Sequence, residues 1–390
     1  MRVVRGKPSM ETNVSKLLLV ACLALVNWPA LAQSAAAVSP QVFVAPRHPA
    51  DAAGANAATT AHASAAAAVS VTGDAADVAL QDKAVALAAQ LDRLLALSRS
   101  PRDQALRWDV GRWAPGTGTG APTGRASLHD AAAHAPSDRL VQWLWARASP
   151  AESGCPGARA CPGRAQALAK LEPGNAAAWM PVLEQAWDDE DGAAIEAALS
   201  RMARASSFDD LFAEYAGAWA EVENRFPAYV AARSAAVSGS GSPVSSEVSS
   251  IVVAIARSSA SAIPNMGTLV DVCDRGKHPE APAARFDRCG AIGRLMLGKG
   301  TTVLSRSIGV AVLRRSGQLT AQDRLANRSL RWSIQQSADL HLDEKDPEGF
   351  RRYFADLVQS ASELAAMERQ VARAGKAASP PAGWKAPDEE

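Results

Sequence analysis

Three things are missing from the sequence: long hydrophobic runs, an excess of charge of one sign, and the residue alternation of β-strands. A transmembrane helix needs about twenty consecutive apolar residues, and no run in these 390 residues is that long. The 41 Lys and Arg against 40 Asp and Glu give no electrostatic reason to expect nucleic acid or an anionic membrane as a partner. Without period-two alternation between turn signals, strands should be rare or absent.

The patterns that mark catalytic and metal sites are also missing. No GxSxG nucleophile elbow is present. His129 and His134 lie five residues apart, whereas two zinc ligands on one helical face lie four apart. The acidic run Asp188–Gly192 lacks the alternating ligands of a calcium loop. We therefore predict no catalytic, cofactor-binding or metal-binding residue.

A glycine-rich stretch beginning at Gly293 superficially matches the phosphate-loop pattern GxxxxGK. The position that needs Ser or Thr is Gly300, and the residues between the glycines are apolar, as in a helix. We interpret the stretch as the end of one helix, with Thr301 or Thr302 capping the next.

The N-terminus has the layout of a secretory signal peptide over residues 1–32. A basic, polar stretch ends at Lys16, the apolar run Leu17–Val26 follows, and Ala30-Leu31-Ala32 forms a small-residue cleavage site before Gln33. Lipoprotein processing at Cys22 remains an alternative, in which the chain would be anchored by a lipid. Because Arg greatly outnumbers Lys and Ala is abundant, as in GC-rich bacterial genomes, we expect a periplasmic or secreted protein.

The rest of the chain divides by composition. Residues 33–76, rich in Ala and poor in large apolar residues, predict a disordered linker. From residue 77 the apolar residues recur at helical spacing, which predicts an all-α fold. The Gly- and Ser-rich segment 237–246 separates two expected lobes, 77–236 and 247–375, and residues 376–390 are expected to be a flexible tail, although Trp384 could dock. Within the lobes, we expect a helix capped by Ser207 and a single helix over 348–374.

The four cysteines beyond residue 32 are an even number, which in an exported chain indicates disulfides. Three pairings are possible. We favour Cys155–Cys161 and Cys273–Cys289, because short loops close at the smaller entropic cost. A four-cysteine zinc site would need CxxC spacing, which is absent.

Residues 168–206 resemble a tetratricopeptide repeat. Leu171, Glu172, Pro173 and Asn175 match the end of such a repeat, and Trp179 lies where the next unit has an aromatic residue. The family's tyrosine is replaced by Ala186, and the surrounding sequence shows no regular 34-residue period. The resemblance implies a helical hairpin that must stack on neighbouring helices, in a solenoid or an irregular helical bundle.

Helical-repeat proteins bind proteins or peptides in grooves, and exposed aromatic residues are frequent anchors there. Trp143 and Trp145, two residues apart, cannot share one face of a helix, so one of them is a candidate binding residue. We therefore expect an exported scaffold that binds a protein or peptide at the cell envelope, with no cofactor. The alternative is an envelope hydrolase whose catalytic residues the sequence does not nominate.

Overall fold

The computed structural model describes residues 75–112, 123–148, 163–238, 245–261, 264–338, 340 and 346–386. Residues 79–390 form one compact unit; of the other unit, residues 1–78, only 75–78 are described. Regular structure in the described ranges is helical, apart from isolated bridges that pair Asn175 with Ser207 and Phe208 with Gly300. The predicted all-α class is confirmed. The signal peptide, Cys22, the Ala32–Gln33 cleavage site and nearly all of the linker lie outside the described residues.

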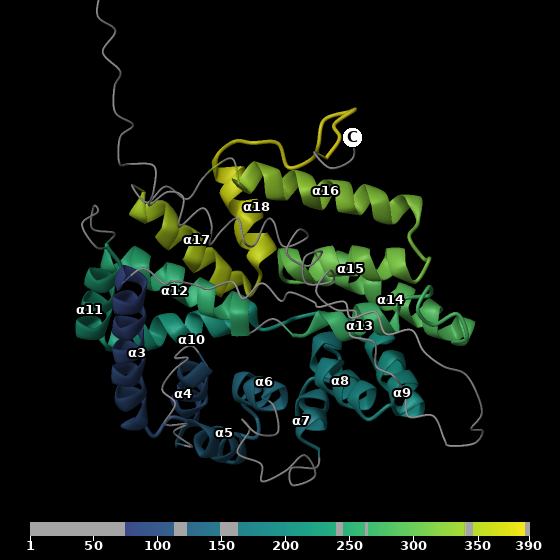
Figure 1. Ribbon diagram of the computed structural model, residues 1–390. Helices are drawn as coiled ribbons and strands as arrows, with labels where there is room; N and C mark the ends of the chain where they lie inside the picture. Colours follow the sequence, from purple (N-terminus) through teal and green to yellow (C-terminus); the bar gives the residue numbers. More distant parts are fainter. Residues whose placement is uncertain are drawn as a thin grey trace, which may run out of the picture. The chain divides into compact units, whose positions relative to one another are not determined.

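The first half of the compact unit is helical, with the 22-residue helix α3 followed by shorter helices (Figure 1). They are α3 (Ala75–Ala96), α4 (Pro101–Arg112), α5 (Thr123–His134), α6 (Arg139–Arg147), α7 (Arg164–Leu171), the single 3₁₀ turn η1 (Ala176–Trp179), α8 (Met180–Asp188), α9 (Gly192–Ala203), α10 (Phe212–Arg225) and α11 (Pro227–Ser238).

The second half contains the remaining helices of the described ranges. They are α12 (Ser246–Ser261), α13 (Met266–Val272), α14 (Ala283–Lys299), α15 (Val303–Arg315), α16 (Ala321–Ala338), α17 (Pro347–Ser360) and α18 (Glu363–Arg373). None of the helices in the described ranges is long and apolar enough to cross a membrane.

Side-chain caps explain where several of these helices begin. The Asp138 carboxylate accepts hydrogen bonds from the backbone N–H groups of Leu140 and Val141 and so starts α6. Thr302, one of the two residues predicted to cap a helix, forms a capping box with Ser305 at the start of α15.

Two predicted helices have different limits in the structure. Ser207 caps no helix; it lies in an extended segment, and α10 begins only at Phe212, after two aspartates. The predicted helix over 348–374 is broken into α17 and α18 at Ala361, whose φ of 51° is left-handed, and Ser362 caps the second part. Hydrophobic spacing continues across both breaks, which is why the sequence pattern did not reveal them.

The glycines of the phosphate-loop-like stretch serve helix packing. Gly293 lies inside α14, and a Cβ built there would come within 2.9 Å of the carbonyl oxygen of Gly309 in α15. A Cβ on Gly309 would in turn lie 2.7 Å from the Gly293 oxygen. Because only glycine permits this approach, α14 and α15 pack backbone to backbone. The prediction that this stretch belongs to a helix and its end is confirmed.

One hydrophobic core includes residues from both sides of segment 237–246. It contains Trp143, Leu199 and Trp219 from the first expected lobe and Leu269 and Ile292 from the second, all completely buried. Helix α10 also packs directly against α12. The predicted lobes are therefore stretches of sequence that share a core.

The C-terminal segment, residues 376–386, is docked on α16 (Figure 1). The Trp332 Nε1 group donates a hydrogen bond of 2.8 Å to the carbonyl oxygen of Ala377, and the Trp332 and Trp384 rings meet edge to face with centroids 5.3 Å apart. Ala386 is 1 % exposed. Trp384, which the sequence suggested could dock, gives the segment an aromatic contact with α16.

Candidate binding site

The two tryptophans selected from the sequence both lie on α6 but differ in exposure. Trp143 is completely buried in the core, with the Arg147 guanidinium 5.6 Å from its ring centroid. Trp145 is half-buried and meets the His129 ring edge to face at 5.9 Å. In this structure Trp143 is a core residue that no partner can reach, and Trp145 offers only part of its ring.

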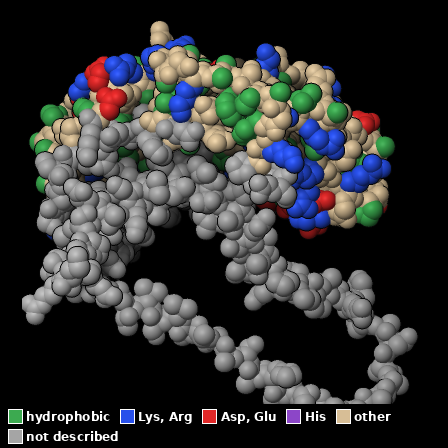
Figure 2. Space-filling view, turned by 90° about the horizontal axis from the view of Figure 1, so that it is seen from above, with side chains coloured by type: hydrophobic (Ala, Val, Ile, Leu, Met, Phe, Trp, Pro, Cys, Tyr) green, Lys and Arg blue, Asp and Glu red, His purple; other side chains and the backbone are tan. Residues whose placement is uncertain are grey.

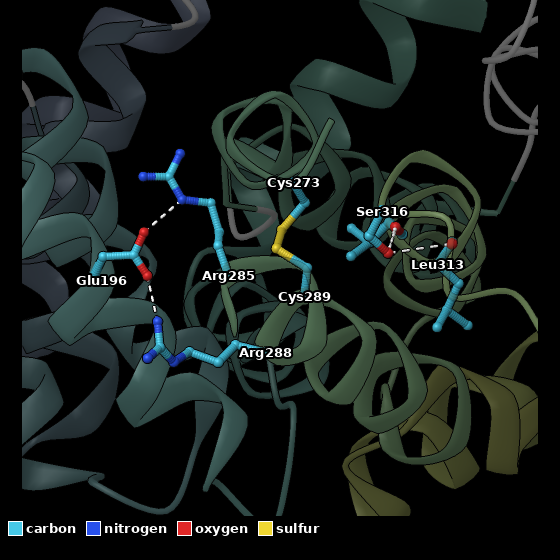
Figure 3. Close-up of a disulfide and its surroundings, with 8 residues drawn as sticks. Glu196, Cys273, Arg285, Arg288, Cys289, Leu313 and Ser316 are labelled. Carbon is cyan, nitrogen blue, oxygen red and sulfur yellow. Dashed lines mark hydrogen bonds and ion pairs between the residues drawn. A yellow bond between two sulfur atoms is a disulfide. The ribbon is translucent and has the colours of Figure 1, made fainter. Parts of the chain in front are cut away.

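The hairpin implied by the tetratricopeptide resemblance is present as η1, α8 and α9. Its outer helix α9 packs on α14, almost a hundred residues further along the chain, and not on a following hairpin. Glu196 on α9 accepts a hydrogen bond of 2.6 Å from Arg285 and another from Arg288 (Figure 3). The described residues thus indicate no succession of repeats, and the family resemblance remains a hypothesis.

The predicted disulfide between Cys273 and Cys289 is formed, which confirms this pairing (Figure 3). It joins the residue after α13 to the middle of α14, and both cysteines are completely buried. The disulfide and the Glu196 ion pairs therefore fix α14 to two different neighbouring helices. The other predicted pair, Cys155–Cys161, lies outside the described residues.

A charged network surrounds the start of α4 and the adjoining part of α10. Arg102, on α4, forms ion pairs with Asp138 at 2.6 Å and with Glu214 of α10 at 2.8 Å. Arg225, at the end of α10, donates two hydrogen bonds to Asp103, one of them 2.7 Å long. Three carboxyl and two guanidinium groups from distant parts of the sequence thus meet at one place, and Arg139, which follows Asp138, continues the network.

The acids of this network have perturbed proton affinities. Burial alone would raise the pKa of Asp103, but the hydrogen bonds from Arg225 and Ser98 outweigh it and lower the pKa. For Glu214 the net effect is the opposite, because burial raises its pKa more than the positive charges of Arg139 and Arg102 lower it. Asp103 is therefore held in its charged form, as a fixed anion beside Arg225.

A pocket of about 400 Å³ opens at this network, between α4 and α10. Leu106 and Ala218 contribute apolar surface, and both are almost completely buried. The polar lining comes from Arg102, Asp103, Glu221 and Arg225, with Ser100 and Asn224 beside them. Glu221 is exposed and has no hydrogen bond or ion pair among the described residues. Most of the lining is therefore polar or charged, which suits a charged or polar group better than an apolar ligand.

The sequence did not nominate these pocket residues. Arg102 and Asp103 stand in the first turn of a helix, where an acid is expected for stabilisation of the helix dipole, and Glu221 and Arg225 have the spacing of an ordinary surface ion pair. Only the packing of α4 against α10, more than a hundred residues apart, reveals the pocket.

A second chemical cluster lies at the start of α15, away from the pocket lining. Asp210 is completely buried and accepts hydrogen bonds from the Thr302 hydroxyl at 2.7 Å and the Thr301 hydroxyl at 3.3 Å. Glu363 accepts a hydrogen bond of 2.8 Å from the backbone N–H of Val303. Burial raises the pKa of Asp210 to about 6 and that of Glu363 to about 7, and Asp210 adds to the latter shift.

Raised carboxyl pKa values are common at catalytic sites, but the oxygens of Asp210 face groups of this chain. Its carboxylate accepts hydrogen bonds from the hydroxyls of Thr301 and Thr302 and from the backbone N–H of Phe212, and solvent does not reach it. We therefore interpret Asp210 and Glu363 as structural residues, whose hydrogen bonds join the start of α15 to α10 and α18. Among the described residues, no group of three or more His, Cys, Asp or Glu could hold a metal ion.

Comparisons with known proteins add no family to this description. The sequence matches no protein-family model, and neither curated proteins nor solved structures show a significant similarity to it.

Proposed function

We propose that this chain is an exported helical protein that binds a protein or peptide at the cell envelope, and that the pocket between α4 and α10 receives a cationic side chain of that partner. Three observations support export and binding. The N-terminus has the pattern of a signal peptide, the Cys273–Cys289 disulfide suits an oxidising compartment, and the α8–α9 hairpin resembles a family of peptide-binding repeats.

The observation that carries the proposal is the charge balance at the pocket. The two lining arginines face four carboxylates, those of Asp103 and Glu221 in the lining and those of Asp138 and Glu214 bound to Arg102. The surplus negative charge favours a cation, and Glu221, an exposed carboxylate that interacts with Arg102 and Arg225 through charge but without a hydrogen bond, is the group proposed to pair with it. The methylene stem of a lysine could pack on Leu106 and Ala218 while its ammonium group reaches Glu221.

The binding test uses two labelled peptides, trilysine and triglutamate, titrated into the purified full chain and followed by fluorescence anisotropy. We expect trilysine to bind and triglutamate not to bind. Glu221→Lys should weaken trilysine binding by about 1–2 kcal/mol, a factor of roughly 5–30, because it replaces an attraction at a partly exposed site with a repulsion.

The matched control is Glu280→Lys, which makes the same charge change at an acid whose side chain is 74 % exposed and which is absent from the pocket lining. It should leave the trilysine affinity unchanged. Equal losses in both variants would show that net charge governs binding and not the pocket. Equal affinity for the two peptides would refute the proposed charge preference.

The proposal of export has a separate measurement. Mass spectrometry of the chain recovered from the envelope fraction should give an N-terminus at Gln33. A lipid-modified Cys22 at the N-terminus would show that the chain is exported as a lipid-anchored protein. An intact Met1 would refute export.

An envelope hydrolase is the alternative function, favoured by one observation: Glu184 has its pKa raised to about 7 by burial, although Arg147 acts against the shift. Glu184 is partly exposed and does not line the pocket between α4 and α10. Turnover of a peptide or glycan substrate that is lost in Glu184→Gln would support this alternative.

A further inference from the structure

The balanced charge of the whole chain hides a strong separation between its parts. Residues 163–238 contain six Lys and Arg and twelve Asp and Glu, a net charge of −6. Residues 283–331 contain ten Lys and Arg and two Asp, a net charge of +8. The overall balance, from which we expected no attraction to an anionic membrane, therefore does not describe the surface of α14, α15 and α16.

Basic side chains gather where α15 ends and α16 begins. Arg314 and Arg315 close α15, and Arg324, Arg328 and Arg331 follow on α16 at spacings of four and three, which place them on one helical face. We call these five residues the basic face. Figure 2 shows Lys and Arg side chains grouped towards the right of the molecule, the side on which Figure 1 places the α15–α16 connection.

The acids close to this face are few and already bonded. Asp274 accepts a hydrogen bond of 2.8 Å from Arg315, and Asp323 accepts hydrogen bonds from the backbone and hydroxyl of Thr320 at 2.9 and 2.7 Å. Both aspartates are buried. On α14, Asp287 is exposed and accepts a weaker bond from Gln318. Arg314 and Arg324 are exposed and have no side-chain partner among the described residues.

Apolar side chains lie beside the arginines of the basic face. Leu325, next to Arg324, is 63 % exposed and is among only four large hydrophobic side chains that are exposed in the described ranges. Arg328 and Trp332 follow it on the same helical face, at spacings of three and seven. Trp384 of the C-terminal segment packs on Trp332, with the Arg328 guanidinium 5.9 Å from its ring. Arginines around a leucine and half-buried tryptophans are the composition of helices that lie at a membrane surface.

We infer that the basic face and Leu325 bind the surface of a bilayer that carries anionic phospholipid headgroups, with α16 lying parallel to it. The arginines pair with headgroup phosphates, and Leu325 enters the boundary between headgroups and acyl chains. A nucleic acid would satisfy the arginines but not the leucine, since its outer surface offers only phosphate and sugar to an exposed side chain beside them. The inference concerns a surface distinct from the pocket, and it stands or falls independently of the proposed peptide binding.

The test is cosedimentation of the purified full chain with vesicles of phosphatidylcholine alone and of phosphatidylcholine mixed with phosphatidylglycerol. The readout is the difference in binding between the two kinds of vesicle, compared between each variant and the wild type, because the basic stretch that ends at Lys16 and the apolar run Leu17–Val26 are the same in all of them. We expect binding to increase with phosphatidylglycerol and to fall with added salt. An arginine near an anionic surface contributes about five-fold to the affinity. The double variant Arg314→Glu with Arg324→Glu loses two such contributions, so its preference for anionic over neutral vesicles should fall by at least about 20-fold.

Two further variants make the outcome specific. Arg204→Glu, at the exposed arginine that caps the end of α9, is the control for a charge reversal away from the basic face and should bind as the wild type does. Leu325→Ser, which keeps every charge, should lower binding to anionic vesicles several-fold. Circular dichroism spectra equal to that of the wild type show that each variant is folded.

Several results would overturn the inference. They are equal binding to both kinds of vesicle, an equal loss in Arg204→Glu, and no loss in Leu325→Ser. Binding to soluble polyphosphate or duplex DNA without binding to anionic vesicles would overturn it as well, and would assign the arginines to a soluble phosphate polymer.

Discussion

Replacement of Asp210 by asparagine should reduce the loss of stability that the protein suffers as the pH rises from acidic to neutral. Asp210 has no solvent exposure, and burial raises its pKa from 3.8 to about 6. The folded state therefore binds the proton more tightly than the unfolded state does. Stability from this group is complete at low pH and is lost as the pH rises from about 4 through 6, because the charged carboxylate must then remain buried.

The magnitude follows from the shift, which is about 2 pH units. One unit corresponds to about 1.4 kcal/mol, so the wild type should lose about 3 kcal/mol of unfolding free energy from this group between about pH 4 and pH 8. Asparagine cannot ionise, and its carbonyl oxygen can still accept the hydrogen bond of the Thr302 hydroxyl. Asp210→Asn should therefore gain about 3 kcal/mol relative to the wild type as the pH rises over this range.

Urea denaturation of both proteins, followed by circular dichroism at a series of pH values, measures this difference. Comparison with the wild type at each pH cancels the titration of groups that do not interact with Asp210, such as Asp356, whose pKa is lowered by its ion pairs with Arg373 and Arg369 against the effect of burial. The titration of Glu363, whose pKa Asp210 raises, contributes to the difference together with Asp210. A constant difference between the two proteins across the range would refute the reasoning. So would a difference that changes in favour of the wild type as the pH rises.

Two further predictions concern links that hold α14 and α16. Joint replacement of Cys273 and Cys289 by alanine should cost about 3 kcal/mol, because the disulfide closes a loop with a sequence separation of 16; a wild-type urea midpoint that does not move on reduction would contradict this. Trp384→Ala should cost about 1 kcal/mol through loss of the aromatic pair and should speed amide exchange in the C-terminal segment. Unchanged exchange there would show that the tryptophan is not the anchor.

Much of the fold could be predicted from local sequence. Hydrophobic spacing predicted the all-α class, and Thr302 marked the start of α15 because a capping side chain acts within three residues. The local pairing of Cys273 with Cys289 was favoured on the same grounds, since a short loop is easily closed. These features depend on neighbours along the chain.

The pocket and the buried acids depend on contacts between distant segments. Asp103 meets Arg225 across 122 residues, and Asp210 meets Thr302 across 92. Each of these residues has an ordinary local role in the sequence, at a helix end or in a turn, so no local pattern distinguishes it. The break at Ala361 was missed for a related reason: a left-handed alanine leaves the hydrophobic spacing on both sides intact.

The most direct test of the proposed function places a photo-crosslinking amino acid at Asn224, which is exposed and lines the pocket. The same amino acid at Glu280, away from the pocket, gives the background. Irradiation of cells that export the chain should yield a crosslinked envelope protein or peptide from position 224 only, joined through a segment that contains lysine or arginine. Glu221→Lys should abolish that product. The same products from both positions, or a product that survives Glu221→Lys, would contradict the claim that this pocket binds the partner.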